Sequence, residues 1–143
     1  MNHVAIMKKE WGLTEKIISK EKKIESRWYK FRHSPWGKIE KGDNVYFKDS
    51  GEPVSIKAKV KKVISFSGLT PKKVRQILNK YGRDDGIERK KIPEFFKLFK
   101  NKKYCLLIFL KNPKKIKPFN IDKTGFGNMS AWLTIKDVGR IKT

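Results

Sequence analysis

Residues 54–66 alternate between apolar and polar side chains, and this segment constrains the fold more than any other. Its apolar side chains lie at the even positions, interrupted once by Lys62: Val54, Ile56, Ala58, Val60, Ile64 and Phe66. Lys57, Lys59 and Lys61 follow one another at the odd positions. Since successive side chains of a strand point to opposite faces, we expect a strand with one buried and one hydrated face. The lysines either decorate that hydrated face, which discourages edge-to-edge pairing, or bind phosphate.

Shorter segments on both sides of this strand also have β character. Strands are expected at residues 3–7, 24–31, 45–47, 104–110, 119–121 and 132–138. Residues 104–110 are continuously apolar, so this strand should be buried on both faces. Residues 111–117 are rich in lysine and contain Pro113, and they are expected to form a basic loop.

About three short helices are expected between these strands. The first should begin with Thr14 as its N-cap and end near residues 20–23. The second spans about residues 70–82 with Thr70 as its N-cap, and the third begins at Pro93. Short strands of mixed length with these helices predict an α+β fold, a small and partly open β-barrel with helices at its rim.

The charge of the chain points to a polyanionic partner. The formal net charge is +22, from 36 basic and 14 acidic residues, and 30 of the basic residues are lysine. Lysine meets phosphate as a point charge, whereas arginine makes the planar fork that reads bases. The excess of lysine therefore favours attraction to a nucleic-acid backbone over sequence readout. Lysine enrichment also occurs in thermophile proteins, although glutamate usually rises with it there.

The composition disfavours several other classes of protein. The chain has no apolar run long enough for a membrane span and no signal peptide after Met1, so no membrane contact is expected. The single cysteine, Cys105, cannot form an internal disulfide, which indicates a reducing compartment such as the cytoplasm. His3, His33 and Cys105 lack the spacing of a metal site, so neither a metal nor another cofactor is expected.

The residues with the most chemistry lie between the first expected helix and the strand that follows it. Lys22, Glu25 and Arg27 stand in the order K-x-x-E-x-R, shortly after Lys20. This pattern resembles the G-x-K-x-x-E-x-R motif of the ASCH family, with Lys20 where the family has glycine. The turn at Lys20 would then be made in a different way or carry a small strain. The Gly42-Asp43 turn before the next strand also resembles the family.

The resemblance implies a PUA-like β-barrel in which residues 1–143 form one domain. Residues 69–101 match no motif of the family and would be a helical insertion that packs on the barrel or forms a lid. The family is linked with RNA binding. Some of its small members are amidohydrolases that act on N4-acetylcytidine, and others are ribonucleases.

The spacing of the motif predicts how its side chains are arranged. In an extended segment, Glu25, Arg27 and Tyr29 point to one face and Trp28 points to the other. Glu25 between two cations would stay ionised, and Arg27 would present its fork to a phosphate or a carbonyl. Trp28, Tyr29 or Trp36 would stack a base of a flipped or single-stranded nucleotide. The alternative is a structural Glu25–Arg27 ion pair, with Trp28 and Trp36 in the core.

A glycine-bearing loop occupies residues 124–131 before the last expected strand. Gly125 and Gly127 would let backbone amides approach a ligand closely. Alternatively, they shape a tight turn in which Met129 and Trp132 fill the core. The pair lacks the third glycine of a dinucleotide-binding fingerprint.

The residues expected to contact nucleic acid are therefore Lys22, Glu25, Arg27, Trp28, Tyr29, Trp36, Lys57, Lys59, Lys61, Gly125 and Gly127. The favoured hypothesis is an RNA-binding module whose lysines neutralise phosphates while the cleft captures a nucleotide or base. The alternative is a hydrolase acting on a modified nucleoside, with Lys22 as a base whose pKa is lowered by burial and Glu25 holding it. A ribonuclease would instead use Tyr29 and Lys30.

Overall fold

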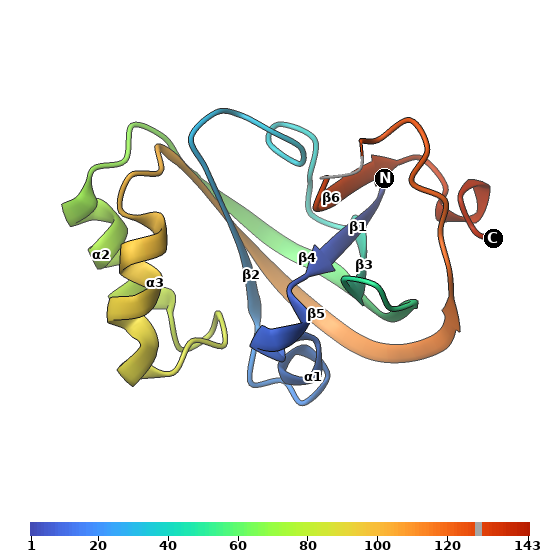
Figure 1. The fold of residues 1–143 in the computed structure, drawn as a ribbon, viewed down its shortest axis with the longest axis horizontal. Helices are drawn as coiled ribbons and strands as arrows, with labels where there is room; N and C mark the ends of the chain where they lie inside the picture. The colour runs from blue at the N-terminus through green and yellow to red at the C-terminus, as the bar shows by residue number, and fades with distance from the viewer. Residues whose placement is uncertain (128–129) are drawn as a thin grey trace.

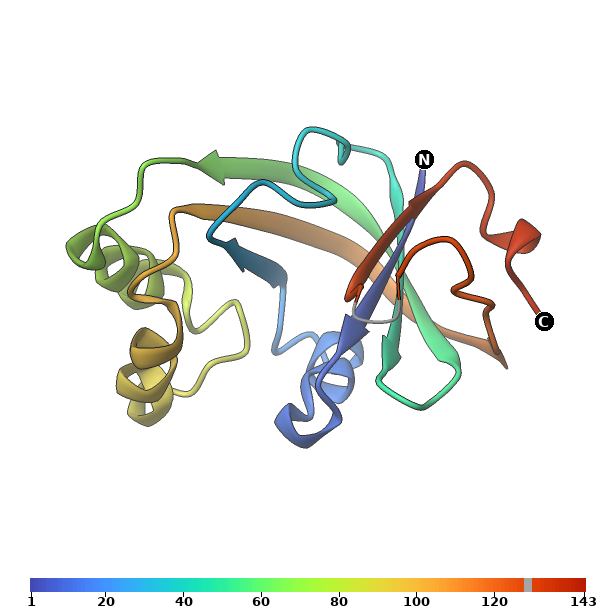
Figure 2. The same ribbon diagram turned by 45° about the horizontal axis from the view of Figure 1, so that its top comes forward.

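One mixed sheet of six strands forms the frame of the protein, within the residues that the computed structural model describes, 1–127 and 130–143 (Figure 1). Its strands are β1 (Asn2–Met7), β2 (Ile24–Tyr29), β3 (Asn44–Asp49), β4 (Val54–Phe66), β5 (Tyr104–Phe119) and β6 (Trp132–Ile135). They lie in the order β2-β5-β4-β3-β1-β6, and only β1 and β3 are parallel. The sheet curls into a half-barrel whose edges, β2 and β6, are not paired with each other (Figure 2). This confirms the predicted α+β fold with a partly open barrel.

Short helices connect the strands. They are α1 (Leu13–Ile18), α2 (Pro71–Tyr81), α3 (Ile92–Phe99) and the 3₁₀ turns η1 (Lys9–Trp11), η2 (Arg89–Lys91) and η3 (Val138–Arg140). Both α2 and α3 lie between β4 and β5 in the chain and gather at one end of the sheet (Figure 1). Thr70 caps α2 as expected, because its side chain accepts a hydrogen bond from the backbone N–H of Lys73. In residues 1–127 and 130–143, no helix is long and apolar enough to cross a bilayer.

The start of α1 differs from the prediction. Gly12, in the left-handed region at φ 62°, precedes the helix. Thr14 lies inside α1, and its hydroxyl donates to the carboxylate of Asp49 at 3.1 Å. Thr14 therefore anchors α1 to the end of β3 instead of capping it. The helix ends at Ile18, earlier than the expected end near residues 20–23.

The predicted basic loop over residues 111–117 is wrong, because β5 continues through it in register with β4. β2 pairs with β5 only as far as Phe109, so the rest of β5 has a single neighbour. Prolines are tolerated in such a stretch, since one side of the strand needs no ladder hydrogen bonds. The predicted strand at 119–121 is reduced to the end of β5 and an isolated bridge between Ile121 and Lys142.

A bulge in β4 changes which face its side chains occupy. The register with β5 shifts between Val60 and Lys62, so one extra residue stands in β4. Beyond the bulge Val63 packs against the cluster that contains Val60, whereas Ile64 and Phe66 pack with the helices. The sequence pattern placed Ile64 and Phe66 on the same face as Val60, and that placement is wrong. Lys62, which interrupted the pattern, marks the bulge.

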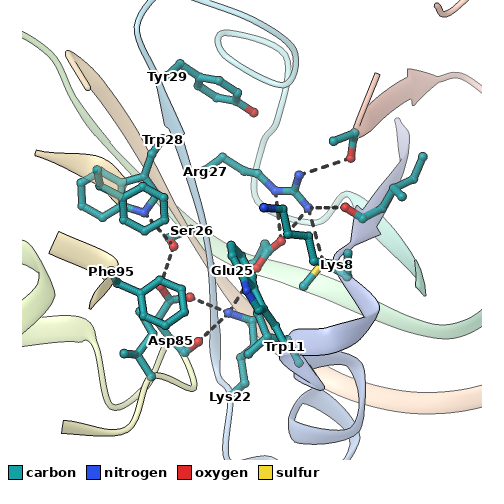
Figure 3. A pocket seen from close by; sticks show the side chains of 16 residues that line it. Lys8, Trp11, Lys22, Glu25, Ser26, Arg27, Trp28, Tyr29, Asp85 and Phe95 are labelled. Atoms are coloured by element: carbon teal, nitrogen blue, oxygen red, sulfur yellow. Dashed lines mark hydrogen bonds and ion pairs between the residues drawn. The ribbon is translucent and has the colours of Figure 1, made fainter. Parts of the chain in front are cut away.

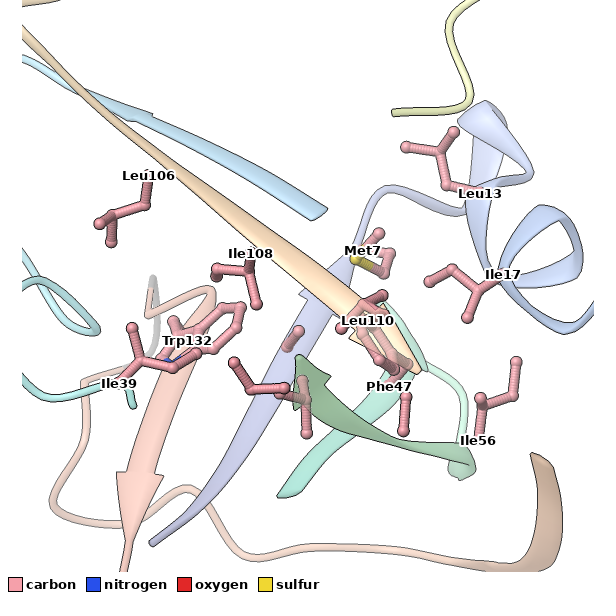
Figure 4. Packing of buried hydrophobic residues seen from close by; sticks show 14 residues of the cluster. Met7, Leu13, Ile17, Ile39, Phe47, Ile56, Leu106, Ile108, Leu110 and Trp132 are labelled. Atoms are coloured by element: carbon pink, nitrogen blue, oxygen red, sulfur yellow. The ribbon is translucent and has the colours of Figure 1, made fainter. Parts of the chain in front are cut away.

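Apolar clusters cover both faces of the sheet. The cluster inside the half-barrel includes Leu106, Ile108 and Leu110 of β5 (Figure 4). The cluster between the sheet and helices α2 and α3 includes Cys105 and Leu107 of the same strand. The prediction that residues 104–110 form a strand buried on both faces is therefore confirmed.

Candidate functional site

The motif begins in a strained turn between α1 and β2. Lys20 has a φ of 67°, in the left-handed region that favours glycine. Its backbone N–H bonds the carbonyl of Ile17 at 3.1 Å and closes the helix. The turn is therefore made with the backbone conformation that a glycine would adopt without strain, as the resemblance to G-x-K-x-x-E-x-R implied.

Lys22, Glu25 and Arg27 meet at the free edge of β2. Lys22 Nζ lies 3.1 Å from Glu25 Oε1, and Glu25 Oε2 accepts from Nη2 and Nε of Arg27 at 2.7 and 3.0 Å. The Lys22 and Glu25 residues are only 2% and 3% exposed. The structure thus brings the three predicted residues together around the single carboxylate of Glu25 (Figure 3).

A fourth charged residue, Asp85, completes this cluster and was missed in the sequence. It lies between α2 and α3, and its Oδ1 is 2.5 Å from Lys22 Nζ (Figure 3). Its backbone carbonyl accepts a second bond from Lys22 Nζ at 2.7 Å, and its Oδ2 accepts from the hydroxyl of Ser26. Trp28 Nε1 in turn donates to Ser26 Oγ at 3.0 Å. The sequence showed only a polar connection at Asp85, with no spacing that related it to the motif.

The electrostatics of the cluster hold Lys22 in its charged form. Burial lowers the pKa of Lys22, but the carboxylates of Asp85 and Glu25 outweigh it and leave that pKa above its ordinary value. Burial raises the pKa of Glu25, but Lys22 and Arg27 outweigh it and leave that pKa lowered. The pKa of Asp85 is raised, mainly by burial and despite Lys22. The expectation of a lowered Lys22 pKa is therefore wrong, because the two carboxylates outweigh the effect of burial.

Arg27 bridges the open side of the half-barrel. Besides Glu25, its guanidinium donates to the backbone carbonyls of Ala131 at 3.3 Å and Ile6 at 3.4 Å. It also lies 5.0 Å from the centre of the Trp132 ring. Most of its five N–H groups are therefore occupied by the protein. Of the two predicted acceptors for the Arg27 fork, a phosphate or a carbonyl, the structure shows carbonyls, and they belong to the backbone of the protein itself.

A cavity of about 290 Å³ lies beside this cluster. Its lining comprises Ile6, Met7, Lys8, Trp11, Leu13, Lys22, Glu25, Ser26, Arg27, Trp28, Tyr29, Asp85, Ile87, Phe95, Phe99 and Ala131. Aromatic rings form much of the wall, with Trp11 edge-on to Phe95 at 5.2 Å and Trp28 stacked on Phe99 at 4.8 Å. We call this space the base cavity, after the stacked base that the sequence predicts (Figure 3).

The charges that line the base cavity nearly cancel. Lys22 and Arg27 are matched by Glu25 and Asp85. The three N–H groups of Lys22 are occupied, because Nζ donates to Asp85 Oδ1 and to the Asp85 carbonyl and forms an ion pair with Glu25 Oε1. Lys8 is the remaining cation, exposed and 4.8 Å from the centre of the Trp11 ring. Such a lining suits a flat, uncharged group better than a phosphate.

A second cavity of about 530 Å³ adjoins the first and shares Arg27, Tyr29 and Ala131 with it. Lys38 and Gly125 also line it. No carboxylate belongs to its lining, within the part of the chain that the structure describes. We call this space the basic cavity. It is open to an anionic group beside the base cavity.

The predicted loop contributes only in part. Gly125 reaches the basic cavity and has a φ of 91°, whereas Gly127, with a φ of 88°, does not line it. Met129 lies outside the described residues. Tyr29 lines both cavities, and burial, partly offset by Arg27, raises its pKa to about 12.

Several predicted residues lie elsewhere. Trp36 is half-buried, packs against the core inside the barrel and lies edge-on to Tyr104 at 5.2 Å, outside the lining of both cavities. Lys57, Lys59 and Lys61 lie on β4, away from both cavities. Trp28 lines the base cavity but is itself only 8% exposed. The core interpretation fits Trp36, while Trp28 serves as both core and cavity wall.

Neither a thiol nor a metal site is built here. Cys105 is fully buried, and burial raises the pKa of its thiol well above the ordinary value. Within residues 1–127 and 130–143, no group of three His, Cys, Asp or Glu side chains is placed to hold a metal ion.

Comparisons with known proteins agree on the architecture. No protein-family model matches the sequence, and no curated protein matches it either. The crystal structure of ASCH from Zymomonas mobilis superposes with a TM-score of 0.68 at 14% identity, over 99% of this chain and 96% of that one. The chain has the ASCH-domain fold. Hypothetical protein PH0355 (TM-score 0.54, 23% identity, 81% of this chain and 100% of that one) is also similar.

The ASCH-domain fold is also similar to a domain of a larger protein. The N-terminal domain of McrB from Staphylothermus marinus superposes with a TM-score of 0.51 at 13% identity, over 83% of this chain and 76% of that one. At these identities the likeness concerns the path of the backbone. The assignment of the site therefore depends on the residues of this chain.

Proposed function

We propose that this protein is an RNA-binding module that captures one base of a single-stranded or extruded nucleotide in the base cavity. The observation that carries the proposal is the lining of that cavity. Aromatic walls stand over a polar floor with four paired charges, of which Lys22, Glu25 and Asp85 are buried and Arg27 is partly buried. A base is flat, apolar on its faces and uncharged, and it gains about 1–3 kcal/mol from stacking on an aromatic ring.

The sugar–phosphate of the same nucleotide would occupy the basic cavity. That cavity adjoins the base cavity and shares Arg27, Tyr29 and Ala131 with it. Lys38 and the backbone at Gly125 are its groups suited to an anion. The large positive net charge of the chain would add attraction to neighbouring phosphates.

The hydrolase alternative is less well supported by the geometry. A general base needs a lone pair near neutral pH. Lys22 has a raised pKa, and its three donors are bonded to Asp85 and Glu25. These contacts support a structural role for the Lys22 ammonium, and Glu25 is occupied by Lys22 and Arg27.

A reducing compartment without membrane contact, such as the cytoplasm, is part of the same proposal.

Ala131 offers a way to test the base cavity without disturbing the charge cluster. It is exposed and lines both cavities, and only its backbone carbonyl bonds Arg27. Ala131→Trp should obstruct the entrance and leave the fold intact. Asn79→Trp, at an exposed position of α2, is the matched control.

The measurement is the fluorescence anisotropy of labelled single-stranded RNA at low and moderate salt. We expect wild-type binding whose log K falls by about 0.7 per phosphate contact for each tenfold rise in salt. Ala131→Trp should weaken it roughly tenfold, the loss of about one stacked base, while Asn79→Trp should not. Absence of binding at low salt, or equal binding by both variants, would overturn the proposal. Release of acetate from N4-acetylcytidine would favour the hydrolase.

A further inference from the structure

The outer face of the β4–β5 ribbon carries lysines placed directly opposite one another. Lys59 of β4 pairs in register with Lys111 of β5, and Lys57 pairs with Lys114. Like charges facing each other across neighbouring strands destabilise a sheet. Two such pairs in succession concentrate positive charge on the ribbon, and a bound polyanion would reduce the repulsion between the lysines.

No acidic side chain relieves this repulsion, within the residues that the structure describes. The exposed and half-buried lysines of this face include Lys57, Lys59, Lys111 and Lys114, whereas Lys115 pairs with the buried Ile56 and points to the other face. None of them forms an ion pair in residues 1–127 and 130–143. On a strand, alternate side chains of one face repeat about every 6.7 Å. The ribbon therefore presents a linear series of cations, which suits a polymer of phosphates better than an isolated ion.

A hollow of about 170 Å³ lies among these cations. Lys57, Lys59, Lys114 and Asn112 line it together with Ala58, whose side chain points to the interior face of the sheet. The register of β4 with β5 shifts at Lys57/Lys59. Asn112 adopts a φ of 53°, a left-handed conformation that asparagine tolerates better than most residues. The bulge thus sets an amide donor among three ammonium groups around one concavity.

We infer that this hollow, here called the ribbon site, binds a phosphate group of an RNA backbone on the outer face of the sheet. Lys59 and Lys57 alternate along β4 with Ala58 and Val60, which face the barrel interior, so the ribbon site lies on the opposite face from that interior. It shares no lining residue with the base cavity or the basic cavity. The inference rests on the proposed function for its choice of RNA as the polyanion.

An abasic single strand separates the ribbon site from the base cavity, because it keeps the phosphates and lacks the bases. The charge variant is Lys59→Gln with Lys114→Gln. Its matched control is Lys72→Gln with Lys97→Gln, which removes the same charge from exposed positions of α2 and α3. Wild-type protein should bind the abasic strand at low salt. The ribbon variant should reduce the salt slope by about 0.7, the contribution of the one phosphate that the ribbon site binds, and the control should leave it unchanged.

Asn112→Gly gives a second, local readout. Glycine accepts the left-handed backbone of Asn112 and removes only the amide, so the fold is retained. We expect roughly tenfold weaker binding of the abasic strand, the loss of one hydrogen bond to a charged group. In wild-type protein the Asn112 side-chain amide resonances should shift on titration with that strand.

The outcomes distinguish the two proposals. Equal loss in the ribbon variant and its control, or unshifted Asn112 amide resonances, would overturn the ribbon site while leaving the base cavity standing. Ribbon effects without any effect of Ala131→Trp on intact RNA would overturn the base cavity alone. Binding to vesicles rich in phosphatidylserine, with no binding of the abasic strand, would assign the face to a membrane and refute the inference.

Discussion

Replacing Lys22 by methionine should destabilise the protein severely, because it unbalances the buried charge cluster. The wild-type cluster holds Lys22 and Arg27 against Glu25 and Asp85. Methionine keeps the volume of the side chain but removes one positive charge from a residue that is 2% exposed. Glu25 keeps its contacts with Arg27, whereas Asp85 keeps only the hydroxyl of Ser26.

The size of the effect follows from the charge left without a partner. Breaking a buried ion pair by removing one member costs about 3–5 kcal/mol. The free energy of unfolding of a typical domain is about 5–15 kcal/mol. Lys22→Met should therefore lose a large share of its stability. The exposed Lys9–Glu52 pair is the control, and Lys9→Met should change stability little, since solvent screens that pair.

A second substitution isolates the electrostatic cause. Adding Asp85→Asn to Lys22→Met restores the charge balance and should recover much of the lost stability, so the two changes are strongly non-additive. The deficit of Lys22→Met should also be smaller at pH 5 than at pH 8. Without Lys22, the pKa of Asp85 rises further above its unfolded value. The folded state then binds more protons than the unfolded state, and stability falls as the pH rises.

Urea unfolding followed by tryptophan fluorescence measures all four proteins at both pH values. A loss below about 1 kcal/mol for Lys22→Met would refute the reasoning, since it would mean that the cluster is hydrated and its charges weakly coupled. A double variant no more stable than Lys22→Met would show that packing, and not charge balance, sets the cost.

Three further predictions concern other parts of the fold. Lys20→Gly should stabilise the protein by about 1 kcal/mol, because it relieves the left-handed strain at φ 67°, while Lys20→Ala should not; thermal unfolding compares them. Burial lowers the pKa of His3 despite its bond to Asp43, so stability should fall as the pH drops below 6.5, where the unfolded His3 takes up a proton and the folded one does not. His3→Gln should flatten this slope in urea unfolding, and an unchanged slope would count against a neutral His3. The Cys105 thiol is buried with a raised pKa, so it should react with a disulfide reagent only after denaturation; rapid labelling of the folded protein would contradict this.

Local patterns in the sequence predicted much of the sheet and the centre of the site. The alternation up to Val60 and the apolar run at 104–110 follow directly from which side chains of each strand are buried. Lys22, Glu25 and Arg27 lie close in sequence on one extended segment, so their meeting followed from strand geometry. The motif left open whether the turn at Lys20 is made in a different way or with strain, and the structure shows the left-handed form.

The remaining features depend on contacts between distant segments. Asp85 reaches Lys22 across 63 positions of the chain, and no local pattern encodes that approach. Nothing in the sequence indicated that Arg27 bonds the backbone carbonyls of Ile6 and Ala131, because a sequence pattern records side chains and not backbone contacts. The extension of β5 through lysines and prolines was missed because pairing with β4 overrides their low strand propensity.

Through Asp85, the segment between α2 and α3 contributes to the site, although no motif in its sequence predicts this. Without this segment, the half-barrel would leave the Lys22 ammonium with Glu25 as its acidic partner and without Asp85. Deleting the helices would therefore not give a smaller protein that still binds its ligand. A displacement of that segment would move the Asp85 carboxylate away from the base cavity and weaken its hydrogen bond with Lys22. Amide hydrogen exchange at residues 83–91 should therefore slow when a ligand binds in the base cavity, because Asp85 and Ile87 line it.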